Sequence, residues 1–483
     1  MMKLADLCAV ARAPEHPVAW VGEHLIEWAE FSARVTKLSH ALAARPEREW
    51  LLACAEPHDF AVALFAVWHA GRRALLPPSL RKGAIAEVRE QADGILDDPA
   101  TWPTSPGAPE DTSLKPLDPA RAGLDLFTSG SSGQPKRIAK CLAQLEAEVA
   151  TLERLWGAPG PVLATVPHHH LYGLLFRLLW PLAAGRPFDS QTCTAPEFLL
   201  ARLAQLGPGR VISSPSQLAR MHELITLESL AGRATRIFSS GGPLNATTAA
   251  RFHVALGEAP LEILGSTETG GIAWRIQDGD DAWTPFPEVA VSVSEASALS
   301  LVSPFLPDHT QLATDDAAEI LDDGRFRLLG RLDRIVKIEE KRLSLAEMEA
   351  RLSSHPWVRE AALVALNGRR QSLGAVLVLD AAGRQALASA GRAACAQTLR
   401  GYLAHWFDAV LLPRQWRYPD TLPYNERGKL AVADLVELFA APASRDEADP
   451  LQAAAGINAV GCAARTMKRQ TVRAAHPTES HDD

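Results

Sequence analysis

Short apolar runs of strand length alternate with longer segments of helical periodicity through the middle of this 483-residue chain. The runs lie at Val162–Val166, Val211–Ser213, Ile237–Ser239 and Leu261–Leu264. Strands separated in this way by helix-length segments are typical of sheets with helices packed on their faces. The alternation predicts an α/β fold built of layers. The chain is long enough for two or three domains, and its 47% hydrophobic residues are enough to fill their cores.

One of the segments between strands has a clear helical face. Its apolar residues, spaced by three and four positions, are Leu142, Leu145, Val149, Leu152 and Trp156. This spacing places them on one side of a helix, which predicts a helix that faces the core.

The later part of the chain predicts a smaller α+β unit. Two alternating runs flank Asp323-Gly324, a dipeptide that tolerates the positive φ of a tight hairpin turn. Ser344 stands three residues before Glu347, which is the spacing of a capping box at a helix start. The runs "EAALVAL" and "LGAVLVL" are typical of strands, and the unit ends near Phe439. Residues 441–483 lack sustained periodicity, which predicts a disordered tail.

Charge and cysteine usage exclude several classes of protein. The formal net charge is -8 and the pI about 6.0, so no overall basic field exists to attract nucleic acid or an anionic membrane. The six cysteines are far apart and form no CxxC pair, which favours a reducing compartment. Charged residues interrupt both the N-terminal stretch and the most apolar later stretch, so neither is typical of a signal peptide or a membrane span. We expect a cytoplasmic protein without a transmembrane segment.

The stretch "FTSGSSGQPK" combines small residues with a lysine directly after a strand-like run. Its residues of interest are Thr128, Ser129, Gly130, Ser131, Ser132, Gly133 and Lys136. Backbone N–H groups of such residues can point into one concavity that suits a polyphosphate. The stretch does not match the GxxxxGK[ST] loop, because Pro135 precedes the lysine and no Ser or Thr follows it. Taken alone, a flexible serine-glycine linker is an equally good interpretation.

Four further segments favour the phosphate interpretation. "ILGSTETGG" runs from a strand into a turn with Thr267 and Glu268, and "ATDDAAEI" carries Asp315 and Asp316. "GRLDRIVKIEEKR" is dense in charge, and "LPYNERGKL" contains Lys429. In this order and spacing, the five segments closely resemble the adenylate-forming superfamily of acyl- and aryl-CoA synthetases, luciferases and non-ribosomal adenylation domains.

The resemblance covers about residues 60–430 and implies a division into domains. A large N-terminal domain of layered β-sheets and helices, residues 1–331, would bind ATP and the acid. A hinge at residues 332–334 would lead to a smaller, mobile α+β domain at residues 335–440 that carries the catalytic lysine. Residues 441–483 would follow this domain as a disordered tail.

The chemistry of this superfamily explains the residue types. A carboxylate attacks the α-phosphate of ATP, which forms an acyl-adenylate and releases pyrophosphate. Both partners are anions, so the site needs cations and N–H donors. By resemblance, Thr128 to Lys136 wrap the β- and γ-phosphates, Thr267 contacts the α-phosphate and Glu268 helps to hold Mg²⁺.

Asp316 and Arg331 would hold the ribose hydroxyls. The Thr-Gly-Asp of the superfamily falls on Thr314-Asp315-Asp316, so Asp315 occupies the usual glycine position. Without the other motifs, a solvated turn would be the interpretation of these two carboxylates.

Three residues near the end of the resemblance would serve the two half-reactions. Lys429 resembles the lysine that bridges the attacking carboxylate and the α-phosphate, where negative charge gathers in the transition state. Asp333 matches the hinge position about which the small domain rotates. Arg342 resembles the arginine that approaches the nucleotide phosphate after that rotation.

The segment "ATVPHHHLYGLLFRLLWPL" resembles the part of the superfamily that lines the acid pocket, with His170 at the key position. A structural histidine is the alternative interpretation. No Asp or Glu occurs between Thr165 and Leu182, which disfavours an amino-acid substrate because its ammonium group would lack a partner. In "FSSGGPL", Gly241 and Gly242 would leave room for a flat ring or an alkyl chain, and Gly242 would also border the nucleotide. An aryl acid such as a hydroxybenzoate is favoured over a fatty acid, because a polar His cluster suits a ring hydroxyl.

The chain departs from the superfamily at two positions. Leu264 stands where an aromatic residue commonly stacks on adenine, and Glu340 replaces a glycine near the path of the pantetheine arm. The second change leaves both CoA and a phosphopantetheine-bearing acyl carrier protein open as acceptors.

The hypothesis is an ATP- and Mg²⁺-dependent, AMP-forming acid–thiol ligase. The alternatives are a medium- or long-chain fatty acyl-CoA synthetase, a non-catalytic nucleotide-binding paralogue, and an enzyme that adenylates without forming a thioester.

Overall fold

The computed structural model describes residues 1–104, 113–129, 135–294, 297–338, 341–366, 372–424 and 430–440. The chain divides into two compact units. Unit 1 comprises Met1–Glu347 and Pro423–Ala431, and unit 2 comprises Met348–Leu422 and the chain from Val432 onward. The predicted hinge at residues 332–334 forms the short helix η6 (Leu332–Arg334), and its role stays a prediction.

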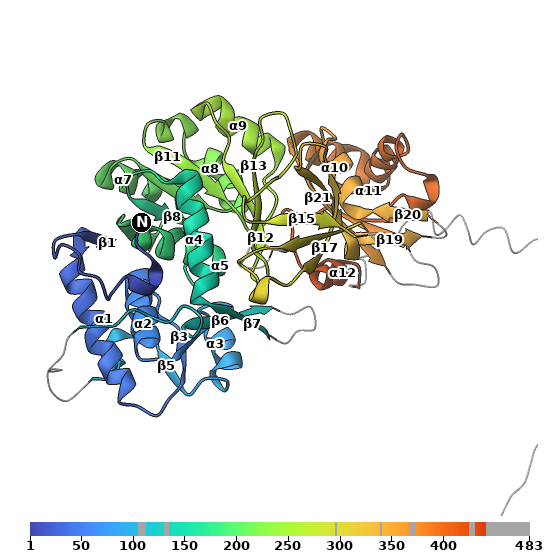
Figure 1. Cartoon of the computed structure of the whole chain (residues 1–483). Coiled ribbons are helices and arrows are strands. Elements are labelled where there is room, and N and C mark those ends of the chain that lie inside the picture. The colour runs from blue at the N-terminus through green and yellow to red at the C-terminus, as the bar shows by residue number, and fades with distance from the viewer. Residues whose placement is uncertain are drawn as a thin grey trace, which may run out of the picture. The chain divides into compact units, whose positions relative to one another are not determined.

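Sheet A of unit 1 contains the strands that the alternating pattern predicted (Figure 1). Its order in the described residues is β14-β13-β12-β11-β10-β8-β9-β1-β2. The bounds are β1 Pro17–Val21, β2 His24–Glu27, β8 Val162–Ala164, β9 Phe188–Thr192, β10 Gly209–Ser213, β11 Ala234–Ser239, β12 Leu261–Ser266, β13 Gly270–Ile276 and β14 Thr284–Pro285. The strands from β12 to β1 pair in parallel, whereas β13, β14 and β2 add antiparallel edges. All four predicted strands are confirmed, and β8 ends two residues earlier than predicted.

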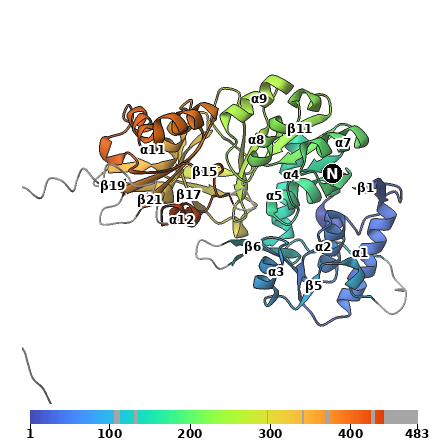
Figure 2. The same ribbon diagram turned by 180° about the vertical axis from the view of Figure 1, so that it is seen from behind.

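Helices cover both faces of sheet A, because successive residues of its buried strands point to opposite sides. On one face, Val211 and Ile237 pack against α7, α8 and α9, which lie together in Figure 2. On the other, Ile212 and Phe238 belong to the core that includes α4 and the π-helix η3. The bounds are α4 Leu142–Trp156, η3 Leu174–Leu179, α6 Trp180–Ala184, α7 Pro196–Leu206, α8 Pro215–Leu224 and α9 Ala246–Leu256. The predicted core-facing helix is confirmed as α4, with Trp156 only partly buried.

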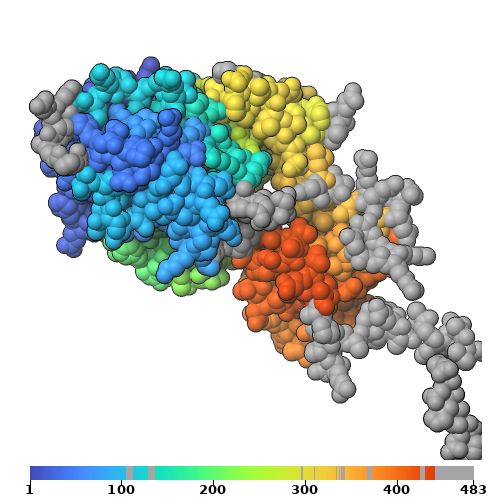
Figure 3. All heavy atoms as spheres, turned by 90° about the horizontal axis from the view of Figure 1, so that it is seen from below, coloured from blue at the N-terminus to red at the C-terminus, as the bar shows by residue number. Residues whose placement is uncertain are grey.

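Sheet B holds the predicted phosphate-binding stretch. Its order is β5-β3-β4-β6-β7, with β7 antiparallel to β6 and the other neighbours parallel. The bounds are β3 Glu49–Leu52, β4 Arg73–Leu76, β5 Gly94–Leu96, β6 Gly123–Ser129, β7 Pro135–Cys141, α1 Trp28–Ala43, α2 Pro57–His69 and α3 Lys82–Arg89. Helix α2 is buried nearly all round, since it packs on the sheet and against α1. In the space-filling view, the blue and cyan segments of this part form one continuous face (Figure 3).

Two small antiparallel sheets complete the strands of unit 1. Sheet C has the order β15-β16-β17-β18, and sheet D consists of β19 and β20. The bounds are β15 Ala290–Val293, β16 Ala298–Val302, β17 Leu312–Ile320, β18 Phe326–Arg331, β19 Ile335–Ile338 and β20 Lys341–Ser344. The predicted hairpin is confirmed as β17–β18, and Gly324 in its turn has a φ of 83°. The Ser344 hydroxyl accepts a hydrogen bond from the Glu347 N–H at 3.3 Å, which confirms the predicted helix start.

Unit 2 is the smaller α+β body. Its sheet has the order β21-β22-β23, in which the predicted strands β21 and β22 form an antiparallel pair. The bounds are β21 Val358–Leu366, β22 Ser372–Leu379, β23 Gln415–Arg417, α11 Ala381–Leu403 and α12 Val432–Ala440, with α10 Leu345–Ser353 leading into the unit. Phe439 of α12 packs over Gly374 of β22, where a Cβ would lie 2.6 Å from the ring. Residues 441–483, the predicted tail, lie outside the described residues.

The predicted fold class is confirmed: layered α/β sheets in a large unit and an α+β arrangement in a smaller one. Within the described ranges, none of the helices combines the length and apolar character that crossing a membrane requires.

Candidate nucleotide and acid site

The β6–β7 hairpin presents the two ends of the predicted phosphate-binding stretch. Thr128 lies opposite Lys136 in the antiparallel register, and Ser129 lies opposite Pro135. The Lys136 side chain is 60% exposed, so its ammonium group is accessible to an anion. The residues of the stretch that lie outside the described ranges are Gly130, Ser131, Ser132 and Gly133.

A buried carboxylate anchors the base of this hairpin. Asp125 of β6 accepts hydrogen bonds from Arg73 Nε at 3.0 Å and from Arg137 Nε at 2.6 Å. Arg137 also donates to Glu49, and this bond is the main cause of the raised pKa of Arg137. Because Arg137 directly follows Lys136, the network fixes the strand that carries the predicted phosphate-binding lysine. This network was not predicted from the sequence, although Asp125 is the one carboxylate inside the apolar run "LDLF".

The turn between β12 and β13 brings Glu268 to this hairpin. Lys136 Nζ donates to Glu268 Oε1 at 3.2 Å, although the two residues are 132 positions apart. Burial alone would raise the pKa of Glu268, but hydrogen bonds and the charge of Lys136 outweigh it, so the pKa lies below its usual range. Glu268 is therefore an anion at neutral pH, next to a cation, at the junction of sheets A and B.

Glu268 and Thr267 suit a magnesium ion that is held mainly by the phosphates of a bound nucleotide. Among the described residues, no group of three or more His, Cys, Asp and Glu side chains could hold a metal by itself. Magnesium in nucleotide sites is commonly bound through one or two carboxylates plus substrate phosphates. An ionised Glu268 beside Thr267 fits that pattern.

The predicted ribose residues meet across the β17–β18 hairpin. Asp316 and Arg331 are opposite one another in the register. The Arg331 guanidinium also contacts the exposed Asp315, at 3.2 Å between Nη2 and Oδ2. Exposed pairs of this kind contribute little to stability, so the contact between Arg331 and Asp315 can open around a ligand at small cost.

The predicted acid segment follows β8, whose neighbours in sheet A are β10 and β9. His170 precedes the single-turn helix α5 (Leu171–Gly173), and its ring centroid lies 4.3 Å from that of His169. His168 is buried against Phe60, and burial lowers its pKa well below the usual value, so it is neutral. Three consecutive histidines thus place polar side chains beside this segment, and the innermost of them, His168, is uncharged.

The predicted pocket wall follows β11, the second strand along the sheet from β8. Gly241 has a φ of 94°, which favours glycine, and no atom lies within 4 Å of the position of a Cβ at Gly241 or Gly242. Ligands in open α/β sheets bind beyond the carboxyl ends of the parallel strands. Both the His170 segment and the Gly241 segment leave sheet A at such ends.

The residues predicted for the domain rotation are only partly described. Asp333 lies in η6, and Arg342 lies in β20 opposite Lys337. Lys429 and Glu340 lie outside the described residues. The roles of all four stay predictions.

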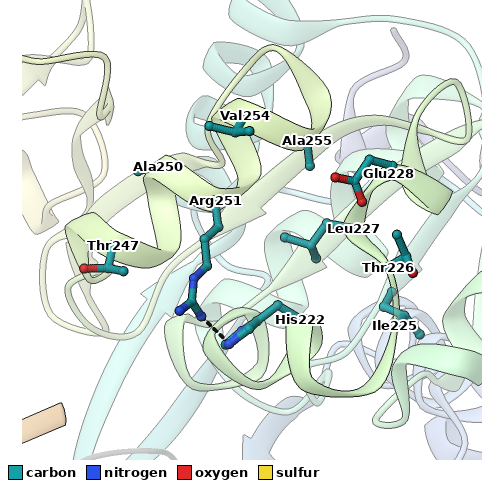
Figure 4. A pocket seen from close by; sticks show the side chains of 10 residues that line it. All are labelled: His222, Ile225, Thr226, Leu227, Glu228, Thr247, Ala250, Arg251, Val254 and Ala255. Carbon is teal, nitrogen blue, oxygen red and sulfur yellow. Dashed lines mark hydrogen bonds between the residues drawn. The ribbon is translucent and has the colours of Figure 1, made fainter. Parts of the chain in front are cut away.

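A surface groove of about 490 Å³ lies elsewhere in unit 1, between α8, α9 and the helix η4 (Leu227–Leu230) (Figure 4). Arg251 and His222 contact one another across it. None of the predicted site residues lines this groove, so it is separate from the candidate site.

Comparison with known proteins bears on the family of the chain. The profile of the family described as AMP-binding enzyme matches residues 78–301. A 4-coumarate–CoA ligase of Cereibacter sphaeroides is 32% identical over 64% of this chain and 71% of its own length. A probable 2-succinylbenzoate–CoA ligase of Mycobacterium tuberculosis is 26% identical over 67% of this chain and 86% of its own length.

Solved structures share the fold at lower identity. ATP-bound MatB from Rhodopseudomonas palustris has a TM-score of 0.76 at 20% identity and covers 91% of this chain and 99% of its own. The O-succinylbenzoate coenzyme A synthetase of Bacillus subtilis, in complex with AMP, has a TM-score of 0.72 at 17% identity and covers 87% and 95%. The predicted resemblance is therefore confirmed, and the chain belongs to the AMP-binding enzyme family, within the adenylate-forming superfamily.

Proposed function

We propose that this protein activates an aryl carboxylic acid with Mg·ATP and then transfers the acyl group to a phosphopantetheine thiol. The first step would form an acyl-adenylate and pyrophosphate, and the second would release AMP. The observation that carries the proposal is the 3.2 Å contact between Lys136 and Glu268. It joins a phosphate-binding cation to a metal-binding carboxylate, which are the two charges that a magnesium-bound triphosphate requires.

Charge neutralisation would be the main contribution of the site to adenylation. Lys136 and the backbone of Thr128–Gly133 would hold the β- and γ-phosphates, and Glu268 would hold Mg²⁺, which withdraws negative charge from the phosphates. Without ligand, the charges of Lys136 and Glu268 neutralise one another. On binding of Mg·ATP, Lys136 would instead pair with a phosphate and Glu268 with Mg²⁺, so neither charge would be left without a partner. Thr267 would contact the α-phosphate that the substrate carboxylate attacks.

The remaining roles follow from the family motifs. Asp316 and Arg331 would bind the ribose, and Gly242 would border the nucleotide. Lys429 would supply positive charge between the acid and the α-phosphate. Rotation about Asp333 would then replace Lys429 by Arg342 for the thiol step.

An aryl acid is favoured by the chemistry around His170. The partly exposed imidazole of His170 can hydrogen-bond a ring hydroxyl, and no carboxylate between Thr165 and Leu182 can pair with an ammonium group. Tyr172 and Phe176, with ring centroids 4.8 Å apart, add aromatic surface beside them. Two relatives that carry the names of aryl-CoA ligases support a hydroxybenzoate-like acid over a medium- or long-chain fatty acid.

Exchange of label between pyrophosphate and ATP tests the first step. The purified protein would be mixed with ATP, Mg²⁺ and a panel of benzoates, cinnamates, fatty acids and amino acids. Exchange that depends on an aryl acid supports the proposal. No exchange with any acid would identify a non-catalytic nucleotide-binding protein.

The acceptor is tested separately with CoA and with a holo-acyl carrier protein. Glu340 stands near the expected path of the pantetheine arm, so we expect a carrier protein, with its extra contacts, to be the better acceptor. Exchange without a thioester from either acceptor would leave an adenylating enzyme that lacks the second step.

A further inference from the structure

A buried lysine and a buried glutamate lie behind the Glu268 turn, on its core side. Lys140 of β7 is 2% exposed and Glu148 of α4 is 4% exposed. Burying charged groups is costly, and apolar residues of similar size commonly give equal or greater stability. Core stability therefore does not explain why these two positions carry ionisable side chains, whereas the groups that they contact do.

Lys140 holds two backbone carbonyls. Its Nζ donates to the Glu268 carbonyl at 2.9 Å and to the Phe305 carbonyl at 2.9 Å. Gln144 of α4 donates to the same Phe305 carbonyl at 3.1 Å. The Glu268 peptide is thereby tied to β7 and α4, while its carboxylate extends in the direction of Lys136.

Glu148 holds the other end of the same turn. Its Oε1 accepts from the Gly271 N–H at 2.7 Å. A Cβ at Gly270 would lie 2.8 Å from Glu148 Oε2, and a Cβ at Gly271 would lie 3.0 Å from Oε1. The two glycines therefore leave the space that the carboxylate occupies. In addition, Gly270 has a φ of 71°, which favours glycine.

Between these two anchors, the turn closes on itself. The Ser266 N–H donates to the Thr269 hydroxyl at 2.9 Å, and that hydroxyl donates to the Gly270 carbonyl at 2.7 Å. Local bonds thus set the shape of the turn, whereas Lys140 and Glu148 set its position relative to β7. The strand β7 also carries Lys136, so one strand supplies both the phosphate cation and the anchor of the metal ligand.

We propose that Lys140 and Glu148 are positioning residues for the nucleotide, which hold Thr267 and Glu268 in the orientation that metal-bound ATP requires. Neither residue touches the ligand; they act through the backbone of the turn. The inference rests on the proposed role of Glu268 as a metal ligand. Its consequence is that the two side chains determine affinity for Mg·ATP rather than the affinity for the acid.

Four variants of the full chain separate this role from general stabilisation. Lys140→Met removes both backbone bonds, and Glu148→Leu removes the acceptor of the Gly271 N–H. Glu148→Gln removes the charge but keeps an acceptor oxygen. The control is Arg202→Met, which breaks another buried ion pair, with Asp189 at 2.8 Å, away from the turn. Circular dichroism and thermal melting would establish that each variant folds.

The readout is the Kd of Mg·ATP, measured by titration calorimetry at several Mg²⁺ concentrations. We expect Lys140→Met and Glu148→Leu to raise this Kd at least tenfold and to shift the Mg²⁺ dependence to higher concentration. Glu148→Gln should stay within threefold of wild type. Arg202→Met should lower the melting temperature but leave the Kd within twofold.

Wild-type affinity for Mg·ATP in both Lys140→Met and Glu148→Leu would overturn the inference. So would an equal loss of affinity in Arg202→Met, because the effect would then be a general loss of rigidity. The binding readout does not require turnover. A wild-type protein that binds Mg·ATP but exchanges no pyrophosphate would refute the proposed function while the Kd comparison still decides the role of the two residues.

Discussion

Glu148 gives the structure a specific dependence of stability on pH. Burial raises the pKa of its carboxyl from 4.5 to about 7, against smaller opposing effects of Lys140 and of the Gly271 N–H. The folded state therefore binds a proton that the unfolded state releases between these two pH values. Its contribution to stability is fully present below pH 4.5 and is lost as pH rises to about 7.

The magnitude follows from the linkage. Each pH unit between the two pKa values changes the unfolding free energy by about 1.4 kcal/mol, which amounts to a loss of about 3 kcal/mol in total. Glu148→Gln has no ionisable carboxyl group at this position, so its stability should not fall in this way between pH 4.5 and pH 7. The difference in unfolding free energy between the variant and wild type should grow by about 3 kcal/mol between pH 4.5 and pH 8.

Urea unfolding at pH 4.5, 6, 7 and 8 measures this difference. The transition of unit 1 is the relevant one, since Glu148 lies there. Glu87→Gln, on the exposed surface of α3, is the matched control and should follow the wild-type profile. Parallel profiles for Glu148→Gln and wild type would show that the carboxyl does not titrate in this window, and the reasoning from burial would be wrong.

Three further predictions concern the candidate site. Lys136→Met should lower the rate of pyrophosphate exchange by about 10²- to 10³-fold, as expected for loss of one charge-stabilising donor, and change stability by less than about 1 kcal/mol because the pair is exposed. Lys429→Ala should abolish adenylate formation but spare thioester formation from a supplied acyl-adenylate. Asp125→Ala should lower the unfolding free energy by about 1.5–3 kcal/mol in urea, because Arg73 and Arg137 lose their charged hydrogen bonds to this buried carboxylate.

Each of these has an outcome that contradicts it. Wild-type exchange in Lys136→Met would remove the lysine from the phosphate site. Equal loss of both half-reactions in Lys429→Ala would argue against the rotation of the small domain. An Asp125→Ala protein as stable as wild type would mean that solvent replaces the carboxylate at no cost, so the hairpin needs no internal anchor.

Much of the local structure could be predicted, because the spacing of apolar residues indicates which side of a helix or strand faces the core. The spacing of Leu145, Val149 and Leu152 predicted α4 and its buried face. The same spacing places Glu148 on that face, three residues after Leu145, so an unusual buried charge was detectable. The hydrogen-bond partner of Glu148 could not be predicted, since the Gly271 N–H comes from a turn 123 residues away.

The site itself depended on contacts that no local pattern contains. Spacing along the chain does not say that β7 and the β12–β13 turn meet, so the Lys136–Glu268 pair could be expected only from the resemblance to a family. The order of strands in sheet A, with β8 between β9 and β10, likewise results from packing of helices on both faces. The role of Asp125 could not be predicted, because the pattern of a strand shows that a residue is polar but not which distant arginines pair with it.

The two halves of the proposed nucleotide site belong to different sheets: Lys136 to sheet B and the Glu268 turn to sheet A. A fragment that contains either sheet alone would thus carry only one sign of the charge pair. If the proposed function holds, nucleotide affinity would therefore depend on the packing of sheet A against sheet B, and a nucleotide at a hundred times its Kd would stabilise the folded chain by about 2.7 kcal/mol. Under the proposed function, bound ATP would hold the two sheets together as well as serve as the substrate.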